Sequence, residues 1–184
     1  GDVPSGRTAS AAILALVAQF EMPKEVYIAE VEKVADEFTT VKTTTNGKMF
    51  LSGGDSWYKL ISAIGDLGEQ DFLPWLEQKT EIGGWPGLRE RAAVSYVKIA
   101  GLDATPFVHK ILSGSREKYD FNCKYLATKE FFEKIAKAES EKAPQEKIDD
   151  AYKMLIEQAQ TLAAGDGGWE LDDMLCKKLP EYST

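Results

Sequence analysis

The sequence is poor in the residues that build metal centres and covalent frameworks. Its 184 residues include one histidine, His109, and two cysteines, Cys123 and Cys176. They do not cluster at the spacing of zinc ligands, which excludes a histidine-rich zinc site, and a lone histidine lacks the partners of a catalytic base. We therefore predict no metal, no cofactor and no catalytic residue. Whether the two cysteines pair stays open, because a disulfide and two separate thiols both fit the sequence.

Loops that bind nucleotides or position a catalytic serine are also missing. The chain has no Gly-x-Ser-x-Gly, no Walker-type loop and no Gly-x-Gly-x-x-Gly. The acidic stretch 166–173 lacks the ligand order of a calcium loop, so we interpret its carboxylates as helix caps. No apolar run approaches the roughly 20 residues that cross a bilayer. The sequence thus predicts no membrane insertion and leans away from an enzyme without deciding the matter.

Positive charge is scarce overall. Lys and Arg number 22 against 30 Asp and Glu, which gives a net charge of -8. A nucleic-acid binder would need a basic face, so nucleic acid is excluded as the expected partner. The segment 82–118 is nevertheless net positive. We interpret this charge first as neutralisation between neighbouring helices, and the alternative is a protein or peptide partner of acidic character. The basic residues of this segment are Arg89, Arg91, Lys98, Lys110, Arg116 and Lys118.

What the chain does contain is a repeated helical pattern. Apolar residues at i, i+3, i+4 and i+7 spacing run over 57–67, and a similar stripe runs over 88–99. Each stripe ends near a glycine, Gly68 or Gly101, that suits the left-handed conformation of a helix end. A helical hairpin cannot bury its apolar face alone, so a repeated one predicts stacking. The matched pairs, 32 residues apart, are Asp71 and Asp103, Pro74 and Pro106, Leu67 and Ile99, Trp75 and Phe107, and Leu76 and Val108.

The repeat predicts local caps and a core. We expect Asp71 and Asp103 to be N-caps, because a carboxylate there accepts hydrogen bonds from backbone N–H groups of the first turn. Pro74 and Pro106 then lie inside that turn, where a missing N–H costs little. The apolar stripes should be mostly buried in one continuous core. Its predicted members are Trp57, Ile61, Ile64, Leu67, Leu76, Val94, Val97, Ile99 and Val108.

The first copy resembles a HEAT-like repeat of the short bacterial type. The resemblance lies in Ala-Ile-Gly-Asp-Leu-Gly at 63–68, followed by Asp71 and by Leu-Pro-x-Leu at 73–76. It is good over 56–79 and looser over 88–113, where Lys98 stands in place of Asp66, and it covers roughly a third of the chain. Such repeats imply antiparallel helix pairs stacked in a right-handed α-α superhelix. They also imply a protein-binding or regulatory role, and they bring no catalytic motif.

The whole chain, 1–184, is predicted to be one all-α domain. Further helices are expected near 8–20, 23–38, 118–138, 144–163 and 171–178, which makes a HEAT-like solenoid of about three helical hairpins plus a capping helix. Residues 41–55 break the helical pattern. They hold β-branched residues around Asn46-Gly47, a hairpin-turn signal, and we interpret them as either a small β-hairpin or an irregular loop inserted in the domain.

Two features are candidates for binding. Met49, Phe50 and Leu51 are three consecutive apolar residues in the insertion, so they either pack on the body or await a partner. Two Gly-Gly-Trp turns place Trp85 and Trp169 before helices, and we favour a hydrophobic plug between helix pairs for both. Combined with the basic segment, these features give a candidate binding set: Met49, Phe50, Leu51, Trp85, Arg89 and Arg91.

Two functions follow. The first is a non-enzymatic protein-interaction scaffold, its partner and oligomeric state unspecified. The alternative is an all-α enzyme or carbohydrate-binding module that uses the Gly-Gly-Trp loops, an analogy with helical toroid enzymes. A pocket that joins either tryptophan to carboxylates would favour the alternative. The chain begins Gly1-Asp2-Val3-Pro4 rather than with Met, which is typical of a trimmed N-terminus, so we expect export to the periplasm or cell exterior, with a cytoplasmic location left open.

Overall fold

The computed structural model is mostly helical, which confirms the all-α prediction. It describes residues 23–53, 56–81, 85–162 and 168–179, and the helix predicted over 8–20 lies outside them. The α-helices are α2 (Lys24–Thr39), α3 (Ser56–Leu67), α4 (Leu73–Glu81), α5 (Pro86–Ala100), α6 (Thr105–Ser113), α7 (Phe121–Ser140), α8 (Gln145–Thr161) and α9 (Gly168–Lys178). Two 3₁₀ helices, η1 (Gln70–Phe72) and η2 (Gly101–Ala104), and two strands, β1 (Val41–Thr43) and β2 (Met49–Leu51), complete the described elements.

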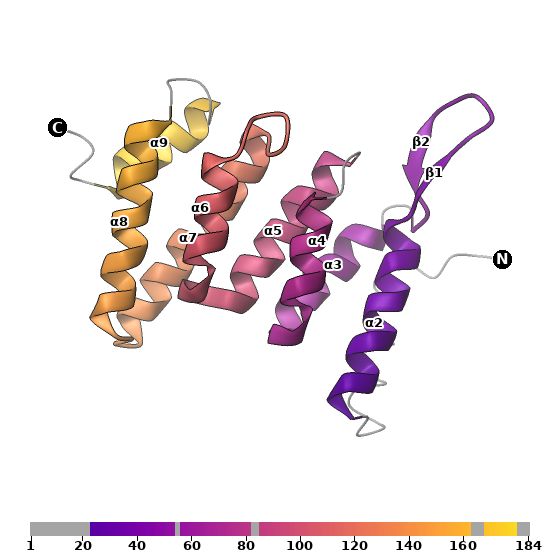
Figure 1. Cartoon of the computed structure of the whole chain (residues 1–184), viewed down its shortest axis with the longest axis horizontal. Coiled ribbons are helices and arrows are strands. Elements are labelled where there is room, and N and C mark those ends of the chain that lie inside the picture. The colour runs from indigo at the N-terminus through magenta and orange to yellow at the C-terminus, as the bar shows by residue number, and fades with distance from the viewer. Residues whose placement is uncertain (1–22, 54–55, 82–84, 163–167, 180–184) are drawn as a thin grey trace.

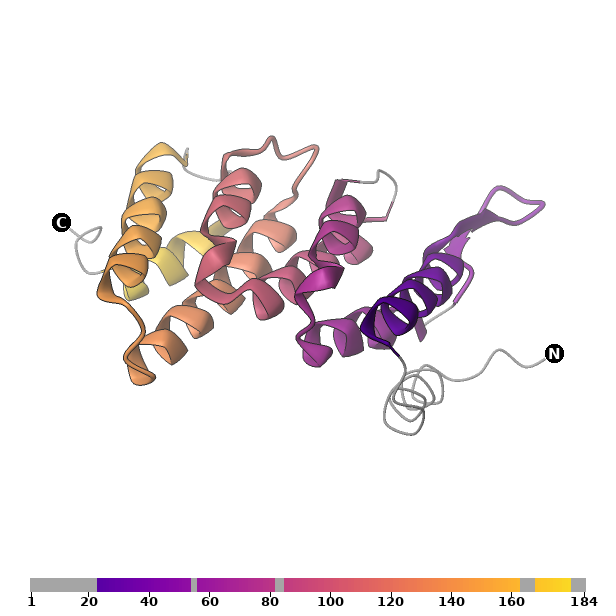
Figure 2. The same cartoon turned by 60° about the horizontal axis from the view of Figure 1, so that its bottom comes forward.

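The helices form two layers in an elongated row (Figure 1). The even layer contains α2, α4, α6 and α8, and the odd layer behind it contains α3, α5, α7 and α9. Within the odd layer, α5 packs against α3 and α7, and α7 packs against α9. The chain crosses between layers at each turn, so α4 packs against α5 and α6 against α7. Figure 2 shows the same order from a second direction, with α8 and α9 at one end and α2 at the other.

A close approach of α3 and α5 depends on one glycine. A Cβ atom built on Gly65 would lie 2.8 Å from the Oγ atom of Ser95, so no larger residue fits without movement. The Ser95 hydroxyl donates a hydrogen bond to the carbonyl of Ile61 at 2.9 Å. Lys98 forms an ion pair with Asp66 at 2.8 Å. Asp66 and Lys98 are 32 residues apart, and their ion pair joins α3 to α5.

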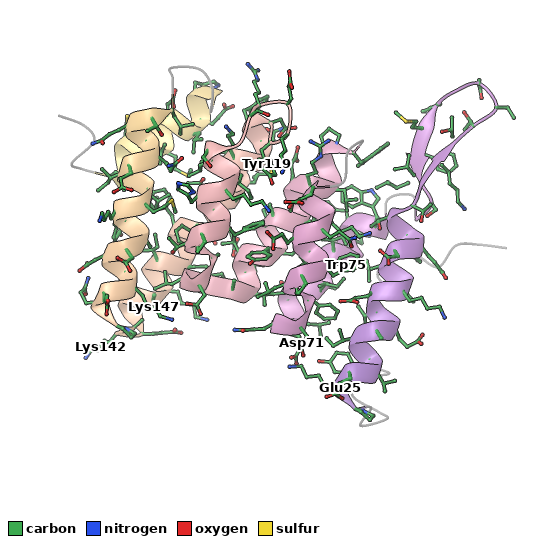
Figure 3. The ribbon with its side chains drawn as sticks, in the orientation of Figure 1. Glu25, Asp71, Trp75, Tyr119, Lys142 and Lys147 are labelled. Carbon is green, nitrogen blue, oxygen red and sulfur yellow. The ribbon has the colours of Figure 1, made fainter. Side chains whose placement is uncertain are left out.

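Side chains tie α2 to α4 in the even layer. The indole N–H of Trp75 donates to Asp36 Oδ1 at 3.1 Å, and Lys79 forms an ion pair with the same oxygen. Trp75 lies between α4 and α2 (Figure 3). Lys79 and Trp75 are buried although both carry polar groups, and the shared Asp36 carboxylate supplies the hydrogen-bond partner that burial requires.

The 32-residue spacing holds in the helix bounds, but the predicted caps are wrong. The helices α4 and α6 both begin and end 32 residues apart. Asp71 lies inside η1 and Asp103 inside η2, and α6 begins after Ala104, which makes no side-chain cap. The 3₁₀ turn ahead of each α-helix moves the aspartate out of the capping position. The carboxylates instead form ion pairs, Asp71 with Lys24 at 2.9 Å and Asp103 with Lys147 at 2.8 Å.

The turn glycines behave as predicted. Gly68 has a φ of 73° and Gly101 a φ of 59°. Both values lie in the left-handed region, where a side chain is strained and glycine is not. Gly101 also ends α5, and its backbone N–H donates to the carbonyl of Val97. These two residues let the chain reverse between α3 and η1 and between α5 and α6.

The core is divided into two clusters, in contrast to the single core predicted. The first cluster is built from α2, α3, η1, α4 and the first half of α5, and the second from the rest of α5 through α9. Ala92 and Ala93 are neighbours on α5 but belong to different clusters, and Tyr96 packs against both. Most of the predicted core residues are buried: Ile61, Ile64 and Leu76 in the first cluster, Val97 and Val108 in the second, and Val94 outside both. Trp57, Leu67 and Ile99 are only partly buried.

The insertion forms a β-hairpin. Strand β1 pairs antiparallel with β2, with Val41 opposite Leu51. Gly47 takes a φ of 80° in the connecting turn. The base is held by backbone hydrogen bonds to the end of α2, from Ser52 N–H to the Thr40 carbonyl at 2.9 Å and from Gly53 N–H to the Phe38 carbonyl at 3.0 Å. Figure 1 shows the hairpin projecting beyond the row of helices next to α2.

Candidate functional site

The hairpin carries exposed apolar side chains on a fixed base. Met49 is 53% exposed, Phe50 39% and Val41 40%, whereas Leu51 is only 2% exposed. Successive side chains of a strand point to opposite faces, so Phe50 and Leu51 cannot both reach the body. Leu51 therefore belongs to the fold, and Phe50 lies on the opposite face of the hairpin. Met49 shares the face of Leu51 but lies nearer the turn and stays exposed.

The hairpin also has open strand edges. Among the described residues β1 and β2 form a sheet of two strands only, so each has one edge without a strand neighbour. An open edge presents unpaired backbone N–H and C=O groups, which can pair with an added strand. The arrangement can therefore offer both backbone hydrogen bonds and an apolar contact to an extended segment.

Trp85 fits the predicted hydrophobic plug. It directly precedes α5 and packs, partly buried, against the first core cluster. A Cβ built on Gly87 would lie 3.4 Å from the Trp57 ring and 3.9 Å from the Trp85 indole nitrogen, so the two indoles border the same small residue. Trp85 thus joins the start of α5 to the start of α3.

Arg89 and Arg91 make contacts within the fold. Arg89 Nη1 donates to the Lys118 carbonyl at 2.7 Å, which fastens the loop before α7 to α5. The Arg91 guanidinium lies 3.8 Å from the centre of the Tyr58 ring. Burial lowers the pKa of Arg91 below its usual value, and the charge of the nearby Glu130 opposes that shift. Of the predicted binding set, these two residues and Trp85 are occupied inside the chain.

The other basic residues of the segment are largely neutralised. Lys98 pairs with Asp66, and Lys110 pairs with Glu77 at 2.8 Å and also with Glu81. Lys118 lies 3.8 Å from the same Glu81 carboxylate. The hydrogen bond from Lys110 holds the pKa of Glu81 below its usual value. These ion pairs join α5 to α3 and α6 to α4, and they favour neutralisation between helices over a free basic surface.

Trp169 differs from Trp85, and the plug prediction is wrong for it. Its side chain is 72% exposed at the start of α9. It lines a groove of about 360 Å³ between α7 and α9, together with the aromatic residues Tyr125 and Phe132. The remaining lining residues are Lys129, Glu133, Glu170, Asp173, Met174, Lys177 and Lys178. The α7 residues were not singled out from the sequence, although 125, 129 and 133 follow the i, i+4, i+8 spacing of one helix face.

The described part of the chain contains no group of side chains arranged as metal ligands and no disulfide bond. No group of three His, Cys, Asp or Glu side chains there could hold a metal ion. His109 is exposed on α6. Cys123 is a free, buried thiol on α7 and Cys176 is exposed on α9, so they form no disulfide with each other. Burial raises the pKa of Cys123 to about 12. No helix within 23–53, 56–81, 85–162 or 168–179 has the length and apolarity to cross a membrane.

Two surfaces therefore stand out, the hairpin with Met49 and Phe50 and the α7–α9 groove with Trp169. Comparison with known proteins adds no assignment to either, since no protein-family model, curated protein or solved structure matches the chain.

Proposed function

We propose that the chain is a non-enzymatic protein-interaction scaffold, a HEAT-like solenoid whose hairpin docks a partner protein. The alternation of helices between two layers and the equal 32-residue offset of α4 and α6 support the solenoid. The observation that carries the function is the exposure of Val41, Met49 and Phe50 on a hairpin that projects from the end of the row.

Exposure alone would be weak evidence, since single apolar residues are common on surfaces. Here three of them gather on one short element, and its base is fixed by the buried Leu51 and by backbone bonds to α2. A fixed element holds its side chains in place before binding, which lowers the entropy cost of association. The open strand edge adds the possibility of strand addition by an extended segment of the partner.

Site-specific photo-crosslinking tests this proposal. A benzophenone side chain would be placed at Met49, and at Lys142 in the turn between α7 and α8 as the control at the far end of the row. We expect a defined protein adduct from position 49 in the native organism and none from 142. Phe50→Ser should lower the adduct yield while stability changes by less than about 0.5 kcal/mol, as for a surface substitution. Equal adducts at both positions, or a Phe50→Ser variant that loses stability and keeps its adduct, would refute hairpin docking.

One observation favours the second candidate, a carbohydrate-binding module. Trp169 is exposed and shares its groove with the carboxylates Glu133, Glu170 and Asp173. An indole face is a large apolar platform with polar groups beside it. Titration with neutral oligosaccharides, followed by the fluorescence of Trp169, tests this function. Saturable binding that Trp169→Ala abolishes is its expected outcome.

A further inference from the structure

We propose that strand β1 of the hairpin takes up an extended acidic segment of the partner protein as an added antiparallel strand, with a carboxylate of that segment beside Lys42. This inference rests on the proposed scaffold function and names the chemistry of the partner at the hairpin. An acidic partner is the alternative interpretation of the segment 82–118 in the sequence, and the geometry assigns that partner to the hairpin instead.

Backbone hydrogen bonds within the hairpin leave one side of β1 open. The Thr44 N–H donates to the Lys48 carbonyl at 2.9 Å, and the Ser52 N–H donates to the Thr40 carbonyl at 2.9 Å. In an antiparallel pair, hydrogen-bonded and non-bonded residue pairs alternate, so the even-numbered residues of this segment face β2. The odd-numbered residues of β1 therefore turn their N–H and C=O groups to the other side, where the described part of the chain has no further strand.

Burial makes β1 rather than β2 the accessible edge. Val41, Lys42 and Thr43 are all exposed, whereas β2 ends in the buried Leu51. The outward backbone groups of Val41 and Thr43 can therefore each exchange a pair of N–H···O=C bonds with one residue of an added strand. Lys42 lies between them, at a position whose side chain comes close to that of the residue opposite.

The hairpin is basic although the chain is acidic. Residues 40–53 contain Lys42 and Lys48 and no Asp or Glu, while the whole chain has a net charge of -8. Both lysines are exposed, and neither forms an ion pair in the described part of the chain. Asp36 and Glu37 precede the hairpin on the last turn of α2, and Asp36 is already paired with α4. The projecting hairpin thus offers two ammonium groups to a carboxylate from outside.

Lys42 also discriminates between possible added strands. Lysine on an edge strand opposes edge-to-edge pairing with an identical strand. Two copies of β1 paired about a twofold axis through the strand centre would place the two Lys42 side chains opposite each other, and like charges in that position destabilise the pair. A Glu or Asp in the same position forms an opposite-charge pair. The edge therefore favours an acidic segment of another protein over a second copy of this chain.

The two faces of the hairpin set the alternation expected in the partner. Directly paired residues share a face, so Lys42 and Phe50 lie on one face and Val41 lies on the other. An added strand with acidic residues on the first face and apolar residues on the second would match both. Its apolar residues would also cover Val41, which is 40% exposed. This alternation defines the peptide that tests the inference.

NMR titration of the full chain tests strand addition with short peptides. The probe is acetyl-Glu-Val-Glu-Val-Glu-amide, and acetyl-Gln-Val-Gln-Val-Gln-amide lacks its charge. We expect shift changes centred on β1, slower hydrogen exchange of the Val41 and Thr43 N–H groups, and at least about threefold weaker binding of the glutamine peptide, the size of cross-strand ion pairs. A third peptide with N-methylvaline at both valines keeps the charges but loses its backbone donors, so it should bind at least about tenfold more weakly.

Charge reversal supplies the matched variants. Lys42→Glu should lower the affinity for the glutamate peptide about tenfold and create binding of acetyl-Lys-Val-Lys-Val-Lys-amide, because the cross-strand pair returns with its signs exchanged. Lys153→Glu makes the same change at an exposed position on α8, at the other end of the row. It should change the affinity less than about twofold, because distant charges are screened. Equal losses in the two variants, or equal binding of the N-methylated peptide, would show diffuse attraction and overturn strand addition.

Crosslinking from position 49 separates this inference from the proposed function. A persistent adduct, with no preference for the glutamate peptide over the glutamine peptide, would reject the acidic strand and leave hairpin docking intact. Absence of the adduct, with charge-dependent protection of Val41 and Thr43 intact, would support the edge and reject docking through Met49. Sedimentation with vesicles that contain about one third phosphatidylserine covers a different occupant. Vesicle binding that Lys42→Glu abolishes, without any effect of the peptides on β1, would assign the hairpin to a membrane surface and overturn the inference.

Discussion

At the scale of single residues, Gly65 shows how a missing Cβ sets a helix–helix distance. The Cβ that alanine adds would meet Ser95 at 2.8 Å on Oγ and 3.1 Å on Cα, and the backbone contact cannot rotate away. We expect Gly65→Ala to lower the free energy of unfolding by about 1–3 kcal/mol, the cost of overpacking. Gly87→Ala is the control. Its new Cβ would lie 3.4 Å from the nearest atom, in the Trp57 ring, which is ordinary van der Waals contact, so this substitution should leave the stability unchanged or raise it. Equal effects of the two changes in chemical denaturation would refute the packing argument.

Cys123 offers a second test at this scale. Burial raises the pKa of its thiol from 9.0 to about 12, so in the folded chain it stays protonated at pH 8. We expect maleimide to label the exposed Cys176 and to reach Cys123 only after unfolding, which mass spectrometry of the two peptides can show. Because an unfolded thiol ionises at lower pH than the folded one, stability should fall as pH rises above about 9. Rapid labelling of both cysteines in the folded chain would contradict the buried position.

At the scale of elements, α7 has an aspartate as its N-cap, whereas the aspartate expected to cap α4 does not reach that position. Asp120 caps α7, since its carboxylate accepts a hydrogen bond from Cys123 N–H at 2.9 Å. Asp71 lies in η1 and forms an exposed ion pair with Lys24. We expect Asp120→Ala to cost about 1 kcal/mol and Asp71→Ala less than about 0.5 kcal/mol, the usual values of an N-cap and of a surface ion pair. Thermal unfolding of the two variants side by side measures the difference, and an equal loss would restore Asp71 as a cap.

These elements also show how far sequence reasoning extends. The apolar spacing and turn glycines located α3, α5 and the reversals after them, because both signals are local. The Asp-x-x-Pro pattern located the start of α4 and α6 but not the 3₁₀ turn ahead of each, since that turn depends on how the chain packs after the glycine. Arg89 looked available for a partner, yet its carbonyl acceptor lies 29 residues away in sequence. Trp85 and Trp169 share a Gly-Gly-Trp motif, and only the neighbouring helices decide which indole is covered.

At the scale of the whole molecule, the division of the core has consequences for folding. Successive helices pack mainly against near neighbours in the row. Helix α5 contributes to both clusters, and the ion pairs of Lys110 with Glu77 and Glu81 also link α6 to α4. Proteins can lose structure in one cooperative unit while another stays folded, and the two clusters are candidates for such units. The hairpin is attached to the first cluster and Trp169 to the second, so the two proposed binding surfaces belong to separate cores.

Paired core substitutions test this division. Ile64 is 1% exposed in the first cluster and Ile135 is fully buried in the second. A carboxylate at either position is an unpaired buried charge and should cost about 3–5 kcal/mol. With two semi-independent cores, Ile64→Asp should reduce the hydrogen-exchange protection of α2, α3 and α4 and largely spare α7 and α8, and Ile135→Asp should do the reverse. Uniform loss of protection along the chain in both variants would show one cooperative unit. In that case α5 would join the clusters into the single core that the sequence predicted, and damage near the hairpin would also disable the groove at Trp169.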